Sequence, residues 1–156
     1  MYSHIILRGK IISPDFIEVI RLIGARISKD VKWALDGSTS LALQGINITP
    51  HDIDILSDSE GAVRIGNSLN EFNTTPVTHS NNEKYDSFFG IFRIMGIKVE
   101  VMGDLRVCRN GEWSQVQNPD TAGVFIVELD GIRVPVVSLK SQAKSGYLEE
   151  RMKREE

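Results

Sequence analysis

The chain has 156 residues, of which 41% are hydrophobic and 25% charged, and its formal net charge at pH 7 is -3. This balance is typical of a globular protein and argues against a surface that coats nucleic acid. No apolar run approaches the ~18 residues of a membrane span. The N-terminus has no signal-peptide pattern, and the one cysteine, Cys108, rules out an intrachain disulfide and a cysteine-based zinc site. We therefore expect one cytoplasmic domain over residues 1–156, with no membrane partner.

The first half of the sequence alternates between helical and strand-like hydrophobic periods. A cap at Ser13 and a proline in the first turn introduce the first helical stripe. In chain order the patterns predict a helix over 14–29, a strand over 31–35, a short helix over 39–44, a strand over 52–56 and a helix over 60–72.

The second half is dominated by strand-like runs. The polar residues 73–86 predict an exposed loop near the site, and residues 104–110 predict an irregular segment. Gly96 and the Asp130-Gly131 pair predict two hairpin turns. The remaining patterns predict strands over 88–95, 97–102, 113–117, 124–129 and 132–136, and a final helix over 138–153. The fold class is therefore mixed α/β (α+β), with a mixed sheet and flanking helices.

Two carboxylates alternate with isoleucines in the run Asp52-Ile53-Asp54-Ile55. On a strand, Asp52 and Asp54 would point to the same face, where they repel each other. A divalent cation between them would compensate this repulsion. An ordinary edge strand that shows its acids to water explains the pattern equally well when it is taken alone.

A third acid, Glu100, stands between Val99 and Val101 in another strand-like run. If this run lies beside the strand of Asp52 and Asp54, three carboxylates converge. Such a cluster needs cations, and with two Mg²⁺ ions it has the geometry of two-metal phosphoryl transfer.

Gly37 and Ser38 form a turn at the start of the predicted short helix. Free backbone N–H groups and a serine hydroxyl at such a turn are suited to binding a phosphate. A plain turn with a capping serine is the simpler interpretation of the pair by itself.

Together, the Gly37-Ser38 turn, the Asp52/Asp54 strand and Glu100 resemble the nucleotidyltransferase superfamily, which has the DNA polymerase β-like fold, and in particular its small antibiotic-type members. The resemblance covers residues 31–103 and implies a mixed-sheet palm, two Mg²⁺ ions and transfer of a nucleoside monophosphate from an NTP, with ATP expected. It also implies that Gly37 and Ser38 contact the triphosphate and that Asp52 and Asp54 bind metal. Glu100 would be the third carboxylate, as a metal ligand or as the base for the acceptor hydroxyl.

Two positions depart from the family pattern. His51 stands where a basic residue commonly precedes the aspartate strand, and the third acid is Glu100 where the family often has aspartate. Asp104 is a rival for the third acid, but its place after Gly103 suggests a strand-end cap. Trp113 is a secondary candidate for stacking against a base, and packing explains it as well.

The acceptor is not specified by any motif. The chain has no large helical region to hold a polynucleotide and no strong basic stripe, so we expect a small molecule or a partner protein rather than nucleic acid. A second subunit could supply a missing wall of the pocket. The alternatives are a catalytically inactive nucleotide-binding or protein-interaction module of the same fold, antitoxin-like, and a two-metal nuclease or phosphatase.

Overall fold

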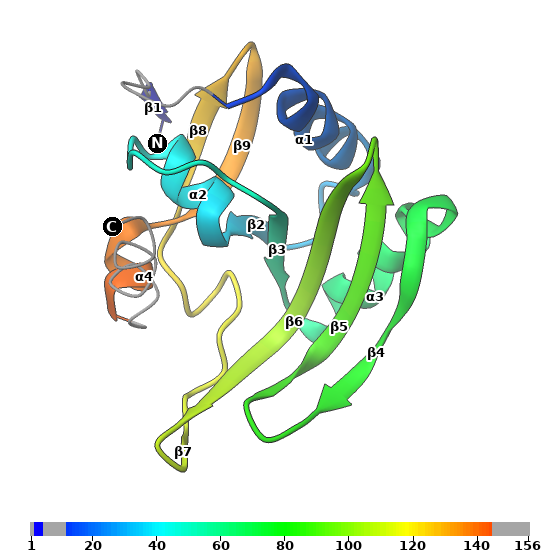
Figure 1. The fold of residues 1–156 in the computed structure, drawn as a ribbon, viewed down its shortest axis with the longest axis vertical. Coiled ribbons are helices and arrows are strands. Elements are labelled where there is room, and N and C mark those ends of the chain that lie inside the picture. The colour runs from blue at the N-terminus through cyan, green and yellow to red at the C-terminus, as the bar shows by residue number, and fades with distance from the viewer. Residues whose placement is uncertain (1, 5–11, 145–156) are drawn as a thin grey trace.

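A mixed sheet forms the centre of the molecule in the computed structural model, which describes residues 2–4 and 12–144 (Figure 1). Nine strands lie in this part of the chain; eight follow the order β1-β8-β9-β2-β3-β6-β5-β4, and β7 pairs with β6. The strands are β1 (Tyr2–His4), β2 (Trp33–Asp36), β3 (Ile53–Ser57), β4 (Asn73–Asn81), β5 (Tyr85–Ile94), β6 (Ile97–Arg109), β7 (Glu112–Trp113), β8 (Val124–Leu129) and β9 (Ile132–Val137).

The helices are α1 (Pro14–Arg26), α2 (Gly37–Leu43), α3 (Ser59–Ser68) and α4 (Leu139–Lys144), with a 3₁₀ turn η1 (Asn70–Phe72). The mixed α/β fold class is thus confirmed. The predicted final helix is present as α4, and its part beyond residue 144 lies outside the described residues. No described helix combines the length and the apolar character that crossing a membrane would require.

Local sequence explains where the first helix begins. The Ser13 hydroxyl accepts a hydrogen bond from the Phe16 N–H at 3.3 Å, and Pro14 occupies the first turn. The buried face of α1 carries Val19, Ile20 and Ile23, as the helical stripe predicts.

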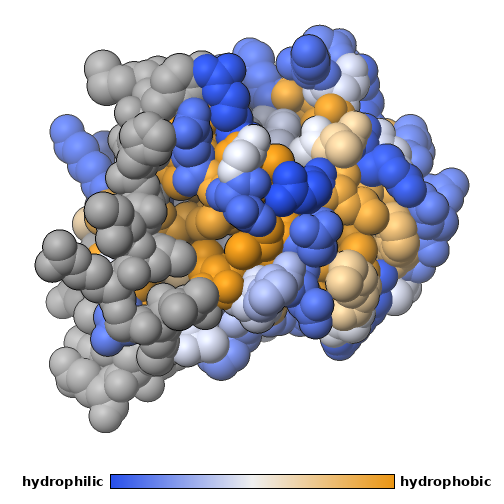
Figure 2. Space-filling model, turned by 90° about the horizontal axis from the view of Figure 1, so that it is seen from above, coloured by the Kyte–Doolittle hydropathy of each residue, from blue (hydrophilic) through white to orange (hydrophobic). Residues whose placement is uncertain are grey.

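The sheet separates two apolar clusters. On one face, α1 and α3 cover the main core, to which Ile53 and Val101 contribute (Figure 1). A smaller cluster on the other face contains Ala34, Leu56 and Val137. Viewed from above, apolar residues gather in the middle of the molecule and hydrophilic residues surround them (Figure 2). The second face, which α1 and α3 leave uncovered, contains the cleft described below.

Both predicted hairpin turns are confirmed. Met95 and Gly96 join β5 to β6 with φ values of 52° and 76°, and Asp130 and Gly131 join β8 to β9 with 48° and 81°. Two successive positive φ values match the right-handed twist of the paired strands.

The loop predicted over residues 73–86 is wrong. Residues Asn73–Asn81 form β4, which pairs antiparallel with β5, and Tyr85 already belongs to β5. The polar composition is misleading because β4 is the outermost strand of the sheet and most of its side chains are exposed. An edge strand of this kind avoids apolar side chains, which would promote aggregation.

The irregular segment predicted over 104–110 is also wrong, because β6 continues to Arg109. A register shift between Asp86 and Phe88 of β5 lies opposite this part of β6, and Asp104 has a φ of 50°. The bulge changes the register of pairing without ending the strand. The predicted strand over 113–117 shrinks to β7, followed by an isolated bridge between Leu105 and Gln117.

Gly103 sets the approach of α3 to β6. A Cβ atom at Gly103 would lie 2.5 Å from the Asp58 carbonyl oxygen and 2.7 Å from Ala62 Cβ. The helix can therefore pack at its observed distance only if this position has no side chain.

Gly103→Ala is expected to lower the free energy of unfolding by about 1–3 kcal/mol, because α3 must move away from the sheet. Gly24→Ala is the matched control: Gly24 is an exposed residue of α1 where an added Cβ would have no neighbour within 4 Å, and alanine there is expected to add roughly 0.5–1 kcal/mol. Urea unfolding of both variants provides the measurement. Equal stability of Gly103→Ala and the unmodified protein would contradict the packing argument.

Candidate active site

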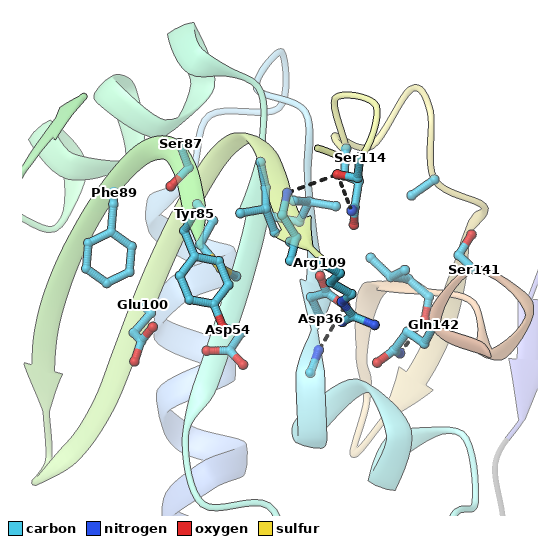
Figure 3. Close-up of a pocket in the computed structure, with 18 of the residues that line it drawn as sticks. Asp36, Asp54, Tyr85, Ser87, Phe89, Glu100, Arg109, Ser114, Ser141 and Gln142 are labelled. Atoms are coloured by element: carbon cyan, nitrogen blue, oxygen red, sulfur yellow. Dashed lines mark hydrogen bonds between the residues drawn. The ribbon is translucent and has the colours of Figure 1, made fainter. Parts of the chain in front are cut away.

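Three carboxylates lie in one row across three neighbouring strands. Asp36 of β2 pairs with Asp54 of β3 in antiparallel register, and Asp54 pairs with Glu100 of β6 in parallel register. Residues paired in this way point to the same face of a sheet, and Figure 3 shows the three side chains along that face. The structure thus brings Asp54 and Glu100 together, as the sequence predicts, and it adds Asp36, which sequence reasoning missed.

Asp52 lies just before this row. Strand β3 begins at Ile53, and the Asp52 carbonyl oxygen accepts a hydrogen bond from the Thr39 hydroxyl at 2.7 Å. The Asp52 carboxylate is nevertheless close enough to raise the pKa of Asp54. Asp52 and Glu100, the other two acids predicted from the sequence, are therefore both close to Asp54.

Two acids of the row, Asp54 and Asp36, have a pKa above the ordinary value of an aspartate. Burial raises the pKa of Asp54 well above its ordinary value, and the charges of Glu100, Asp36 and Asp52 raise it further. Burial also raises the pKa of Asp36, against a hydrogen bond from Gly37 that lowers it. A row of half-buried acids is costly to ionise unless positive charge is near.

Lys98 supplies one such charge. Its Nζ atom lies 2.8 Å from Glu100 Oε1, and this hydrogen bond with Glu100 is the main reason that the pKa of Lys98 is raised. Sequence reasoning missed Lys98, although a residue two positions before Glu100 on a strand must share its face.

Gly37 brings the backbone against the Asp54 carboxylate. A Cβ atom at Gly37 would lie 2.2 Å from Asp54 Oδ2, and its φ of +64° belongs to the left-handed region that glycine tolerates. The Gly37 N–H donates to Asp36 Oδ1 at 2.9 Å. Ser38, the second predicted phosphate contact, is only 6% exposed. Of the predicted pair, Gly37 lines the cleft described next.

The row of acids stands at one end of a cleft with a volume of about 720 Å³. From there the cleft runs along the uncovered sheet face; Figure 3 shows Tyr85 among its lining residues, which also include Leu56, Met102, Leu105 and Trp113. Its polar lining includes Ser80, Asn82, Ser87, Arg109, Glu112, Ser114, Gln117, Ser141, Gln142 and Lys144.

Trp113 is well placed at the far end of this cleft. It is 39% exposed, and the Arg106 guanidinium lies 5.3 Å from the centroid of its ring. The second ring face can stack on a ligand, since aromatic faces bind flat groups.

Asp104, the rival third acid, lies in a different environment. Its Oδ2 accepts a hydrogen bond from the Ser59 N–H at 3.0 Å, and its Oδ1 accepts one from Asn118 Nδ2 at 2.8 Å. The carboxylate thus fixes the start of α3 and the loop before β8, whereas Glu100 pairs with Asp54. His51, in the loop before β3, is exposed.

The donor set of the site consists of oxygens, the ligands that Mg²⁺ prefers. Among the described residues, no three His, Cys, Asp or Glu side chains form a ready-made metal-binding group. Asp54 is nonetheless a half-buried acid whose pKa is raised by desolvation and by three neighbouring carboxylates. A divalent cation fits this donor chemistry and this excess of negative charge.

Residues 18–156 match the model of the aminoglycoside-2''-adenylyltransferase family. The chain belongs to this family. It is also similar to the crystal structure of a Thermotoga maritima protein proposed to be a nucleotidyltransferase, with 37% identity and a TM-score of 0.81 over 92% of this chain and 90% of that one. No curated protein matches the chain significantly. The resemblance to antibiotic-type members of the nucleotidyltransferase superfamily is thereby confirmed.

Proposed function

We propose that the protein transfers the nucleoside monophosphate of an NTP, AMP from ATP, to a hydroxyl group of a small molecule bound in the cleft. The observation that carries this proposal is the row of Asp36, Asp54 and Glu100 at the end of a cleft of about 720 Å³ in a member of a nucleotidyltransferase family. Cavities of roughly 300–1,000 Å³ are the usual size for small ligands.

Asp52, Asp54 and Glu100 would hold Mg²⁺, with two ions expected. When bound, Mg²⁺ stabilises negative charge that develops on the phosphoryl oxygens. Their oxygen donors and the raised pKa of Asp54 support this assignment.

The remaining chemistry belongs to the chain. The acceptor oxygen attacks the α-phosphorus in line, the bond from this phosphorus to the bridging β-phosphate oxygen breaks, and pyrophosphate leaves. Glu100 Oε2, the oxygen that is not paired with Lys98, takes the proton of the acceptor hydroxyl. Gly37, which lines the cleft, contacts the triphosphate, and Asp36 holds the Gly37 turn in place through its hydrogen bond.

The acceptor would occupy the far part of the cleft. Tyr85 and Trp113 offer ring faces there, and Asn82 and Gln117 offer hydrogen bonds. These groups suit a hydroxyl-bearing compound with a ring in its body. The name of the family describes transfer to an aminoglycoside, so aminoglycosides are the first compounds to test.

The decisive experiment incubates the protein with Mg²⁺, ATP labelled at the α-phosphate and a panel of aminoglycosides and other ring-containing alcohols. Label on a small-molecule acceptor together with pyrophosphate release supports the proposal. Label on a protein indicates that the acceptor is a protein and not a small molecule. Release of inorganic phosphate indicates hydrolysis. ATP binding without turnover over the whole panel would favour the inactive binding module.

Glu100→Gln is expected to lower kcat by about 100- to 10,000-fold, the usual contribution of a general base. Its affinity for ATP is expected to change much less, because the amide keeps the shape of the side chain. Single-turnover rates and calorimetric titration measure the two quantities. Asp104→Asn is the control and should retain kcat; if it loses kcat and Glu100→Gln does not, Asp104 is the third acid.

A further inference from the structure

Lys98 and Glu100 form an ion pair inside the group of acids. The Lys98 Nζ atom lies 2.8 Å from Glu100 Oε1, with 34% of the lysine side chain and 22% of the glutamate side chain exposed. Because both groups are partly shielded from water, their attraction is stronger than that of a fully exposed surface pair.

Lys98 also acts on the other acids. Asp54 is paired with Glu100 in the register of β3 and β6, so the Lys98 ammonium bound to Glu100 is also near Asp54. Its ammonium therefore offsets part of the repulsion within the row. It does so from a neighbouring position on β6, where no hinge or loop movement is needed to bring it to the acids.

We propose that Lys98 is the built-in counter-ion of this site: it holds Glu100 through Oε1 when no divalent cation is bound, and it releases that oxygen when a cation binds. This inference rests on the proposed function, because it takes Asp52, Asp54 and Glu100 as the residues that receive the cation. Lys98 is then a positioning residue, which keeps Glu100 in the row of acids.

Competition between Lys98 and a cation predicts that removing Lys98 raises the affinity for the cation and lowers the stability of the metal-free protein. Removing Lys98 frees Glu100 and removes a positive charge that repels the cation, so affinity for the cation alone should rise. The same change leaves the acids without a counter-charge, so the metal-free protein should become less stable. A lysine with a purely structural role would not improve cation binding when it is removed.

The experiment titrates the protein with Mn²⁺ in the absence of nucleotide and follows free Mn²⁺ by electron paramagnetic resonance, since Mn²⁺ accepts the same oxygen ligands as Mg²⁺. Lys98→Met is expected to bind Mn²⁺ about 3- to 10-fold more tightly, the effect of one partly exposed charge nearby. In EDTA its melting temperature should fall, and added Mn²⁺ should raise it more than in the unmodified protein.

Two variants serve as controls. Lys98→Arg keeps the charge and should behave like the unmodified protein in both measurements. Lys32→Met removes a similar ion pair, with Asp120 at 2.7 Å, from outside the cleft, and it should leave Mn²⁺ affinity unchanged. Agreement of Lys98→Met with Lys32→Met, or weaker Mn²⁺ binding by Lys98→Met, overturns the inference.

Failure of the inference can be told apart from failure of the proposed function. If the unmodified protein transfers AMP but Lys98→Met does not change Mn²⁺ affinity, only the role of Lys98 is wrong. If Lys98→Met tightens Mn²⁺ binding while no NTP is bound or consumed, the counter-ion role stands and the transferase proposal fails. Absence of Mn²⁺ binding by every variant overturns both.

Discussion

Asp54→Asn should reduce AMP transfer by at least about 100- to 1,000-fold, the loss typical when a group that stabilises transition-state charge is removed. Asp54 lies between Asp36 and Glu100 in the register of the sheet, and the charges of Glu100, Asp36 and Asp52 all raise its pKa. The variant should still fold, because asparagine has the same shape. Rates with labelled ATP and a circular dichroism spectrum provide the measurement.

In the absence of metal, Asp54→Asn should also change how the stability of the folded protein depends on pH. The pKa of Asp54 is raised above its ordinary value of 3.8 by folding, so the unfolded chain gives up this proton at lower pH than the folded one. As pH rises from about 4 through the raised pKa, this group makes the folded state progressively less stable. Asparagine has no such proton, so Asp54→Asn should melt at a higher temperature than the unmodified protein, with a gap that grows with pH.

Melting curves in EDTA from pH 4 to pH 8 test this result. Asp120→Asn, which removes an exposed carboxylate outside the cleft, is the control for the loss of a carboxylate as such. A constant difference between Asp54→Asn and the unmodified protein at all pH values would mean that Asp54 is not protonated more readily in the folded state.

Gly37→Ala is expected to disrupt the site at its most crowded point. The added methyl group would lie 2.2 Å from Asp54 Oδ2, so the carboxylate or the turn must move. A displacement of about 1 Å at a reacting centre can lower a rate by ~100-fold. The residue would also keep a φ of +64°, which costs an L-amino acid roughly 1–2 kcal/mol.

Gly45→Ala separates these two effects. Gly45 also has a positive φ, +90°, but a Cβ added there would have no neighbour within 4 Å. It should therefore lose stability through backbone strain and retain its rate. Kinetics and urea unfolding of both variants test the argument, and equal rates for Gly37→Ala and Gly45→Ala would show that contact with Asp54 is unimportant.

Much of the fold could be predicted from hydrophobic period and turn chemistry. The stripe of Val19, Ile20 and Ile23 and the hairpin glycines at 96 and 131 are local signals, and the structure follows them. The errors arise where tertiary context overrides local composition. Strand β4 is polar because it is an edge, and Asp104 has a left-handed backbone within a strand that nevertheless continues.

The site was predictable only in part, for a similar reason. Asp54 and Glu100 are visible in the sequence because each alternates with apolar residues. Asp36 ends its strand and reveals its role only through the pairing of β2 with β3, a register that the sequence does not specify. Lys98 was overlooked because a lysine next to a hairpin is usually a solvated residue.

The parallel pairing of β3 with β6 has a consequence for how the protein is made. Glu100 reaches Asp54 only after the intervening chain of α3, β4 and β5 has been synthesised, so a growing chain that stops before β6 holds at most two members of the row. Contacts between such distant segments carry the entropic cost of closing a long loop, which slows folding. A ligand that binds the whole row can therefore stabilise only a chain in which β6 has already been made.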